Sequence, residues 1–336
     1  MTCEERMAAD QSNVIETPEE LPAEMTAVRV HRFGAAPQLD RLPLPEVGEG
    51  EVLVKMVASV VSHHDLTVAG GRFAVRPALP YTPGLEGAGT VVRVGAGAGS
   101  EVALGSLVRL YGGGLGASRA GTWAEYVVVP ERVVLEVPPQ LDAEVAAACG
   151  SVALTAWVAL FEVGSMQRGE RVAVAGASGA VGSLVVQLAL RHGAERVVAL
   201  VREKERGGAL PSGVEVVVGD DGVEPPVDLL VDTVGGPRLS SRVGMVNPGG
   251  RVAYLGYTAG QEACFTLPNL LARDVRLLPV NMMRRRPPRD LESRLIGQFA
   301  AGELQVATVG VEARRLATAV AQLDAGRARG RVVARW

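Results

Sequence analysis

The chain of 336 residues has few of the residues that mark several common classes of protein. Its three cysteines, Cys3, Cys149 and Cys264, include no C-x-x-C pair, which excludes a disulfide framework and a cysteine-based zinc lobe. Aromatic residues make up only 4%, and the net charge is -3 with the basic residues scattered along the chain. A nucleic-acid-binding surface is therefore not indicated.

The sequence has no stretch typical of a signal peptide or a membrane span. Residues 1–25 are acidic and lack an apolar core, so we expect a disordered leader. The one long uncharged run, residues 145–161, is shorter than the ~20 residues that a span requires and is rich in alanine. We expect it to form a buried helix at a domain junction, and we expect the protein to be soluble and cytoplasmic.

Valine, alanine, glycine and leucine are abundant and form short apolar runs between turns. In residues 26–148 the runs EVLVKMVASVV, GAGTVVRVG, SLVRLYG and WAEYVVVP predict an antiparallel, barrel-like domain. In residues 149–283 strands such as ERVAVAGA, ERVVALV and VDLLVDTVGG alternate with helices, which predicts a doubly wound parallel sheet. Residues 284–336 contain two amphipathic helices and a final strand, RVVARW.

The strongest local motif is a strand, a glycine-rich turn and a helix, with the sequence VAVAGASGAVGSLVVQLAL. Glycine in such a turn permits close approach of the backbone to a pyrophosphate, and the N–H groups at the helix start face the anion. A purely structural turn is the alternative. The residues predicted to bind a dinucleotide here are Gly176, Ser178, Gly179, Ala180, Val181 and Gly182.

The end of the second strand of this region indicates which dinucleotide binds. An NAD site typically carries an acidic residue at that place, whereas this chain has Arg202, followed by Lys204 and Arg206. Because guanidinium groups bind a phosphate dianion bidentately, the pattern predicts NADPH, bound by Arg202 and Arg206. The alternative is a solvated helix face, since two glutamates lie between these basic residues.

Longer stretches, among them PYTPGLEGAGTVVRVG, GTWAEYVVVP, AAACGSVALTAW, AGASGAVGSLVVQLAL, NPGGRVAYLG and GRARGRVV, together resemble one family. It is the medium-chain dehydrogenase/reductase superfamily, in its zinc-free quinone oxidoreductase and enoyl reductase branch. The resemblance implies an α/β protein with a GroES-like β-barrel substrate domain (26–148), a Rossmann domain (149–283) and a C-terminal segment (284–336) that returns to the substrate domain. It also implies an active site in the cleft between the domains, and a homodimer through Rossmann edge strands, here VRLLPVNM.

Two adjacent histidines, His63 and His64, raise the question of a metal. In zinc-dependent relatives the segment resembling SHHD begins with a cysteine ligand, and the one resembling GLEGAG carries histidine after its first glycine. Here Ser62 and Leu85 stand at these places. Neither a hydroxyl nor an isobutyl group replaces thiolate or imidazole at a tetrahedral zinc, so we expect no metal.

Without a Lewis acid, a conjugated carbonyl such as a quinone or an enone is the expected substrate, because hydrogen bonds and one proton donor suffice for it. The resemblance places His64 where a hydroxyl faces the substrate and His63 near the cofactor phosphate or ribose, with Ser62 beside them. We predict these three as catalytic residues, with His64 as proton donor or oxyanion contact; the alternative is that the histidines fill the cleft wall. The resemblance implies four further cofactor-binding residues: Val234, Gly256, Asn281 and Arg331.

Two departures from the family pattern concern the nucleotide site. Asp220 stands where a tyrosine frequently helps to bind the 2′-phosphate, and DDGVEPP is too short for a full crossover helix. The predicted function is an NADPH-dependent, zinc-independent oxidoreductase that transfers hydride to a conjugated carbonyl, with a tailoring enoyl reductase of a natural-product pathway as its nearest variant. A cofactor-binding protein without turnover, or a non-reducing cyclase that uses the same cleft, is the alternative.

Overall fold

The computed structural model describes residues 15–16, 20–98, 102–203, 210–220, 223–224, 226–285 and 287–336. The chain divides into two compact units. Unit 1 comprises residues 1–151, 296–303 and 307–336, and unit 2 comprises residues 152–295 and 304–306. The first boundary lies three residues beyond the one expected from the sequence because it falls inside a continuous helix, where no turn marks it. The second lies at residue 296 rather than 284, inside another helix.

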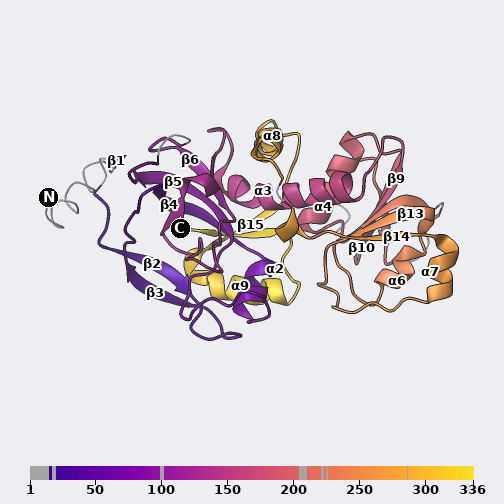
Figure 1. The fold of residues 1–336 in the computed structure, drawn as a ribbon, viewed down its shortest axis with the longest axis horizontal. Coiled ribbons are helices and arrows are strands. Elements are labelled where there is room, and N and C mark those ends of the chain that lie inside the picture. The colour runs from indigo at the N-terminus through magenta and orange to yellow at the C-terminus, as the bar shows by residue number, and fades with distance from the viewer. Residues whose placement is uncertain are drawn as a thin grey trace. The chain divides into compact units, whose positions relative to one another are not determined.

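Unit 1 is built on an eight-stranded sheet in which β15, β16, β4, β5, β6 and β8 follow one another, while β1 pairs with β5 and β7 with β4 (Figure 1). Every pairing is antiparallel except that of β15 with β16. The strands are β1 (Ile15–Glu16), β4 (Glu51–Val61), β5 (Glu86–Val94), β6 (Leu107–Tyr111), β7 (Tyr126–Pro130), β8 (Val134–Glu136), β15 (Thr308–Glu312) and β16 (Arg331–Arg335). The antiparallel pattern predicted from the short runs is confirmed.

Both faces of β4 are buried, which explains why its sequence is apolar almost throughout. Val52 and Val54 belong to one hydrophobic cluster, and Leu53, on the opposite face, belongs to another. The second cluster contains Ala27 of β2 (Glu24–Arg29), which pairs with β3 (Gln38–Pro43) in a separate two-stranded sheet. β2 thus begins inside the predicted leader and Ile15–Glu16 pairs with β5, while residues 1–14 and 17–19 lie outside the described residues.

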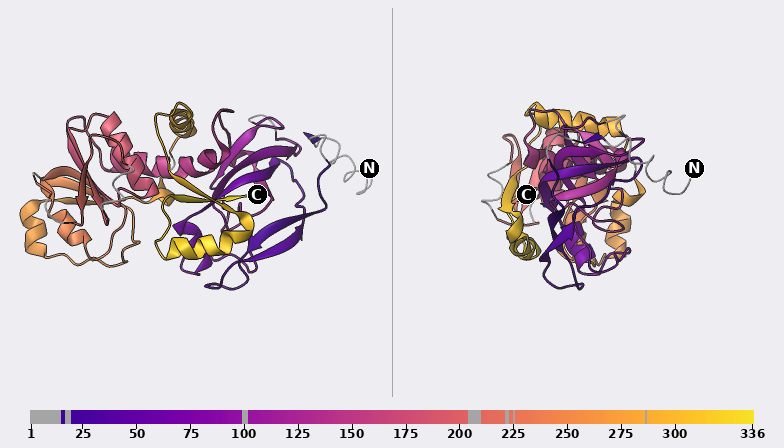
Figure 2. Two further views of the ribbon diagram at one scale, coloured as in Figure 1. Left: turned by 180° about the vertical axis from the view of Figure 1, so that it is seen from behind. Right: turned by 90° about the vertical axis from the view of Figure 1, so that its left-hand side faces the viewer.

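The C-terminal strand β16 pairs with β4, so residues about 270 positions apart in the chain are neighbours in one sheet (Figure 2). Trp336, directly after β16, donates from its indole Nε1 to the hydroxyl of Ser59 at 2.8 Å. Its ring also packs against two clusters of buried side chains. The end of the chain is therefore fixed within unit 1.

Unit 2 contains a six-stranded sheet in the order β11-β10-β9-β12-β13-β14, and all five pairings are parallel. The strands are β9 (Arg171–Ala175), β10 (Arg196–Val201), β11 (Glu215–Val218), β12 (Val227–Asp232), β13 (Val246–Tyr254) and β14 (Arg276–Pro279). The strand order reverses between β9 and β12, which in such sheets marks the place where ligands bind at the carboxyl ends of the strands. The predicted parallel sheet is confirmed.

Helices connect many of the strands. Helix α3 (Ala143–Trp157) continues into a π-helical turn, η3 (Val158–Val163), and together they are long and apolar enough to cross a membrane. Length and composition are weak evidence for a membrane span, because 67% of the most apolar stretch of this helix is buried inside the protein, as in an ordinary core helix. The other helical elements are α2 (His63–Ala69), η2 (Glu131–Val133), α4 (Ala180–Arg191), α6 (Leu239–Val243), α7 (Leu267–Arg273), η4 (Met282–Arg284), α8 (Arg289–Ala300), η5 (Ala313–Arg315) and α9 (Leu316–Asp324).

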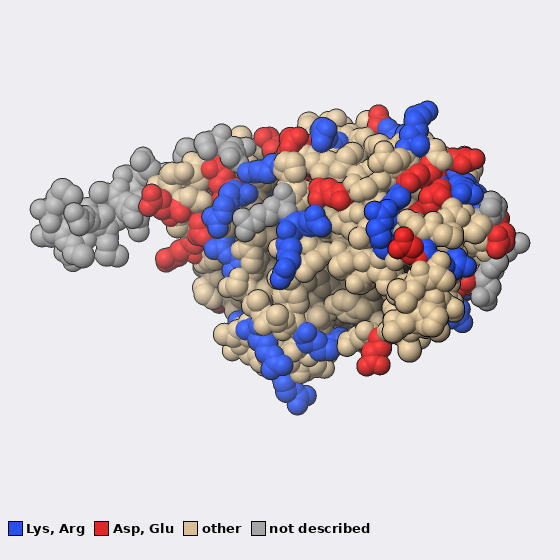
Figure 3. Space-filling model, turned by 45° about the vertical axis from the view of Figure 1, so that its right-hand side comes forward, with Lys and Arg blue, Asp and Glu red and all other residues tan. Residues whose placement is uncertain are grey.

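On the face of the molecule drawn in Figure 3, Lys and Arg side chains are interspersed with Asp and Glu. Such an arrangement differs from the continuous basic stripe of a nucleic-acid-binding surface.

Candidate active site

The glycine-rich turn of unit 2 connects β9 to α4. Gly176 has a φ of +73°, in the left-handed region that favours glycine, and it directly follows the last residue of β9. Gly179 is the N-cap of α4, and no side chain bonds to the free N–H groups of the first helical turn. The predicted residues from 176 to 182 thus form a turn with open backbone donors at the start of a 12-residue helix, which is the arrangement that binds a phosphate anion.

Close backbone packing explains why glycine recurs at this edge of the sheet. A Cβ atom added to Gly182 would lie 2.2 Å from the carbonyl oxygen of Gly176. One added to Gly256, after β13, would lie 1.7 Å from the carbonyl oxygen of Thr233, after β12, and one on Gly235 would lie 2.2 Å from that of Gly256. The start of α4 therefore packs on the backbone of its own turn, the loops after β12 and β13 touch backbone to backbone, and side chains larger than hydrogen do not fit at these positions.

The structure places Val234, Gly256 and Asn281 at the same edge as the glycine turn, because each follows a parallel strand. The N–H of Val234 donates to the buried carboxylate of Asp232 at 2.9 Å, which fixes this loop. Asn281 follows β14 and is exposed, and its side chain accepts from the N–H of Met283 at 3.0 Å. Contact of these residues with a cofactor stays a prediction.

Arg202 lies directly after β10 and is exposed, with no hydrogen-bond or ion-pair partner among the described residues. A free guanidinium at this strand end is compatible with a phosphate contact and with the solvated alternative, so the role of Arg202 stays a prediction. Arg206, the second residue predicted to bind the 2′-phosphate, lies outside the described residues.

In unit 1 the segment SHHD lies directly after β4, and its two histidines begin helix α2. Ser62 is the N-cap, with extended backbone (φ -123°, ψ 162°), and its hydroxyl accepts from the N–H of Asp65 at 3.4 Å. The Asp65 carboxylate in turn accepts from the Ser62 N–H at 2.8 Å and from its hydroxyl at 2.6 Å. This reciprocal pair is a capping box, so the Ser-x-x-Asp spacing was the signal for a helix. The hydroxyl of Ser62 is thus already bonded, and its catalytic role stays a prediction.

Asp65 is buried and holds α2 against the strand that contains Glu86. Besides the two bonds from Ser62, its carboxylate accepts from the backbone N–H of Leu85 at 3.1 Å. Burial raises the pKa of Asp65, although these donors and the charge of His64 act in the opposite direction. The residue at the position of a zinc-binding histidine in relatives, Leu85, is therefore bonded through its backbone.

The two histidines are the first two residues of α2, so the helix turns their side chains in different directions. His63 is exposed; partial loss of solvation and the positive charge of Arg331 lower its pKa, while Asp324 raises it to a smaller extent. His63 is thus neutral at pH 7 and can donate a hydrogen bond but no charge to a phosphate. His64 is half-buried, and its ring contacts the Phe73 ring edge-on, with 4.7 Å between centroids.

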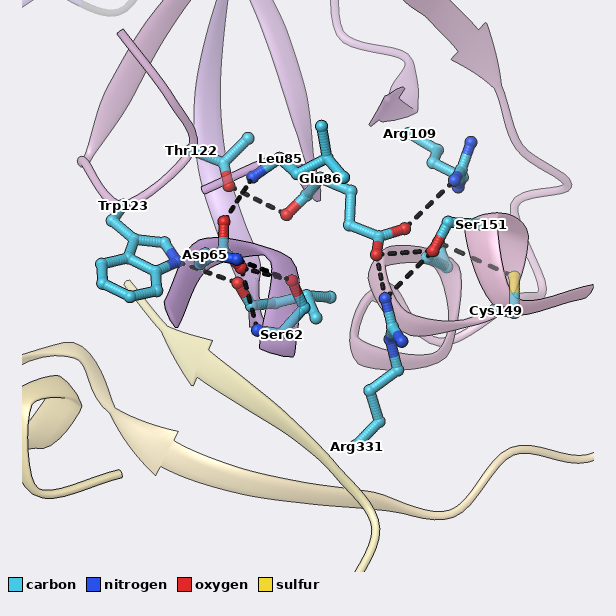
Figure 4. A network of polar contacts seen from close by, with 12 residues as sticks. Ser62, Asp65, Leu85, Glu86, Arg109, Thr122, Trp123, Cys149, Ser151 and Arg331 are labelled. Carbon is cyan, nitrogen blue, oxygen red and sulfur yellow. Dashed lines mark hydrogen bonds and ion pairs between the residues drawn. The ribbon is translucent and has the colours of Figure 1, made fainter. Parts of the chain in front are cut away.

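A buried carboxylate, Glu86 of β5, binds two guanidinium groups and a hydroxyl (Figure 4). One oxygen accepts from Arg109 of β6 at 3.2 Å. The other accepts from Ser151 of α3 at 2.7 Å and from Arg331 of β16, which also donates to the Ser151 hydroxyl at 3.0 Å. Burial lowers the pKa of Arg331 to about 10, so this group stays charged at neutral pH. Arg331, which was predicted to meet a cofactor phosphate, is therefore bonded to Glu86 and Ser151.

Sequence reasoning missed Arg109 and Ser151 as members of this network. The available signal was weak: Arg109 is the one charged residue in the run LVRLY, and Ser151 lies in an apolar helix. A charge within a buried strand predicts a buried partner but does not identify it.

Comparison with known proteins identifies the family. Residues 48–139 match the family model described as the alcohol dehydrogenase GroES-like domain, and residues 180–298 match that of zinc-binding dehydrogenases. A quinone oxidoreductase of Sus scrofa is 30% identical over 249 residues, which cover 69% of this chain and 73% of the relative. The chain belongs to the medium-chain dehydrogenase/reductase superfamily, in its quinone oxidoreductase-like branch.

Solved structures agree with this assignment to the medium-chain dehydrogenases/reductases. An NAD-dependent alcohol dehydrogenase superposes with a TM-score of 0.82 at 26% identity, over 93% of this chain and 100% of that one. A mycobacterial quinone oxidoreductase superposes with a TM-score of 0.79 at 25% identity, over the same shares of the two chains. The protein is thus an oxidoreductase with a GroES-like unit and a Rossmann-like sheet, and its superfamily typically binds a nicotinamide cofactor.

The name of the second family model implies zinc, and the side chains here do not fit that metal. Among the described residues, no group of three or more His, Cys, Asp or Glu side chains lies close enough to hold a metal ion. At the places of the family's ligands stand Ser62, bonded to Asp65, and Leu85, an alkyl side chain. Glu86 is occupied by two guanidinium groups. These groups do not provide the three protein ligands of a catalytic zinc.

Proposed function

We propose that this quinone oxidoreductase-like protein is a zinc-independent, NADPH-dependent reductase of small-molecule conjugated carbonyl compounds, such as quinones and enones. The observation that carries the proposal is the turn from Gly176 to Gly182, which leaves open N–H groups at the start of α4. Such a helix start binds the pyrophosphate of a dinucleotide. The 30% identity to a quinone oxidoreductase supports the same class of reaction.

The choice of NADPH over NADH rests on Arg202. It occupies the strand end at which an acidic residue would accept from the ribose 2′-hydroxyl of NADH. An exposed guanidinium without a partner among the described residues favours a 2′-phosphate instead, because it compensates the negative charge.

The substrate class follows from the side chains of unit 1. Bound NADPH would supply a hydride, and the electron pair displaced from the conjugated acceptor would then collect on its carbonyl oxygen. His64 is half-buried at the start of α2, and an imidazole there can donate the proton that this oxygen takes up. Because zinc does not fit here, we propose an acceptor with a delocalised charge rather than a simple ketone.

The test is anaerobic mixing of the purified protein with NADPH and a panel of quinones and enones. We expect the absorbance of the reduced nicotinamide to fall with at least one acceptor, and NADH to be a poorer donor. In His64→Phe, which keeps an aromatic ring against Phe73, we expect kcat to fall by roughly 10²- to 10⁴-fold. The matched control is His31→Gln, because His31 lies after β2 and contacts Asp40 of β3. Binding of NADPH without consumption in any reaction would instead identify a redox-neutral protein.

We also propose that a second copy of this chain pairs with the edge strand β14. Among the described strands, β14 pairs only with β13, so its outer N–H and C=O groups are available to another strand. The neighbouring helix α7 has no buried residue and exposes Leu267 and Leu271, which a partner would cover. Light scattering should give the mass of a dimer, and Leu271→Glu should shift it toward the monomer; a monomeric wild type would contradict this.

A further inference from the structure

The connection from β11 to β12 in unit 2 is held by a buried guanidinium. The described residues between these strands contain no helix. Instead Arg242 of α6, with 3% of its side chain exposed, binds the carboxylates of both Asp220 and Asp232, with 3.0 Å from its Nε to Asp220. A third bond, of 3.2 Å, goes to the carbonyl oxygen of Gly235. Arg242 thus ties the loop after β11 to the loop after β12.

Asp220 carries a second guanidinium, that of Arg238. The Nη1 atom of Arg238 lies 3.3 Å from the Asp220 oxygen that Arg242 does not bind. Unlike Arg242, Arg238 has 70% of its side chain exposed. Its Nε and Nη2 atoms have no partner among the described residues and remain available as donors. Both oxygens of Asp220 are therefore neutralised, and the residue does not present a free negative charge to a ligand.

Both aspartates at this end of the sheet are paired, and one arginine is not. Asp220 and Asp232 bind Arg238 and Arg242, whereas Arg202 has no partner among the described residues, although the carboxylate of Glu203 follows it in the chain. The backbone at the end of β10 lies beside that of β11, because the N–H of residue 219 donates to the carbonyl oxygen of residue 201 at 2.9 Å. Arg202 follows residue 201 and Asp220 follows residue 219, so the backbones at Arg202 and Asp220 are neighbours. Because Arg238 is bonded to Asp220, both arginines belong to this end of β10 and β11.

We propose that Arg238 is a specificity-determining residue that binds the 2′-phosphate of NADPH together with Arg202, and that Arg242 positions it through Asp220. The inference rests on the proposed function, in which NADPH is the cofactor. It explains how an aspartate at position 220 is compatible with a 2′-phosphate. Its two oxygens hold guanidinium groups in place, and the exposed one of these keeps two donors for the anion.

The experiment is a calorimetric titration of the full-length protein with two fragments, 2′,5′-ADP and 5′-AMP, which differ by the 2′-phosphate. We expect the wild type to bind 2′,5′-ADP at least about tenfold more tightly. Arg238→Gln should lose about tenfold in affinity for 2′,5′-ADP and keep that for 5′-AMP within about twofold. Arg276→Gln is the control, because this exposed arginine begins β14, at the opposite end of the strands.

The outcomes separate this inference from the proposed function. An Arg238→Gln protein that keeps the wild-type preference for 2′,5′-ADP, or that weakens both fragments equally, overturns the inference while leaving NADPH-dependent turnover in place. A wild type that binds NADPH and NADH equally well overturns both the choice of cofactor and the role of Arg238. Arg238→Lys, which keeps the charge without the planar fork, should retain part of the preference; full loss in this variant together with unchanged 5′-AMP binding would still support a bidentate contact.

Discussion

Replacing Glu86 by glutamine tests whether the buried network holds unit 1 together. Glu86 is bonded to both Arg109 and Arg331, and all three side chains are at most 10% exposed. The substitution keeps the shape and one acceptor oxygen, enough for Ser151, but removes the negative charge that Glu86 places against two buried guanidinium groups. Removing one partner of a buried ion pair costs about 3–5 kcal/mol, so we expect the free energy of unfolding to fall by this amount.

Urea denaturation followed by tryptophan fluorescence measures this loss. Of the three tryptophans, Trp123 and Trp336 belong to unit 1 and Trp157 to unit 2, so a Trp157→Phe background restricts the signal to unit 1. In thermal denaturation, at about 2–4 °C per kcal/mol, the Tm should fall by about 6–20 °C.

The control is Glu144→Gln, which breaks an ion pair with Arg335 whose guanidinium side is half exposed, and which should cost less than about 1 kcal/mol. If Glu86→Gln unfolded within about 1 kcal/mol of its parent, the reasoning about buried charge would be refuted.

Two further predictions concern the glycine turn and the first histidine. Gly182→Ala places a Cβ atom 2.2 Å from the carbonyl oxygen of Gly176, so NADPH affinity should fall at least about tenfold in a fluorescence titration, whereas Gly297→Ala, where nothing lies within 4 Å, should match the wild type. The lowered pKa of His63 means that the unfolded chain takes up a proton near pH 6.5 and the folded chain does so only at lower pH. The free energy of unfolding of the wild type should therefore decline as the pH falls from 6.5 through the folded pKa of His63. Denaturation of His63→Gln at a series of pH values should show a shallower decline. Identical profiles for the two proteins would show that His63 does not titrate in this way.

The elements that were predictable from the sequence are those that bury apolar side chains in a regular pattern. The run EVLVKMVASVV coincides with β4, and the turn before α4 was recognised because glycines stood between a valine-rich strand and an apolar helix. By contrast β3, QLDRLP, buries none of its residues fully, and α7 buries none at all, so neither has an apolar face that a periodicity could indicate.

The candidate site was predictable where a local motif specified it and obscure where distant residues meet. Arg331 and Glu86 are 245 positions apart, and only the folded sheet places β16 next to β4, one strand away from β5. Equally, Arg242 lies in an ordinary polar helix, and nothing in its neighbourhood indicates that it replaces a missing crossover helix by binding Asp220 and Asp232. Side-chain pairing across the sheet edges is a property of tertiary structure, which no single local pattern contains.

The position of β16 in the sheet of unit 1 has a consequence for synthesis on the ribosome. About 270 residues separate β4 from its neighbour β16, and at 5–20 residues per second this interval takes roughly 15–55 s. The continuous part of unit 2, residues 152–295, emerges whole within that interval and can complete its own sheet first. Residues 51–55 of β4 pair with β7, but residues 58–61 lack their neighbour until residues 331–335 arrive. The nascent protein thus passes through a period in which this short apolar edge is open to the wrong strands and to chaperones.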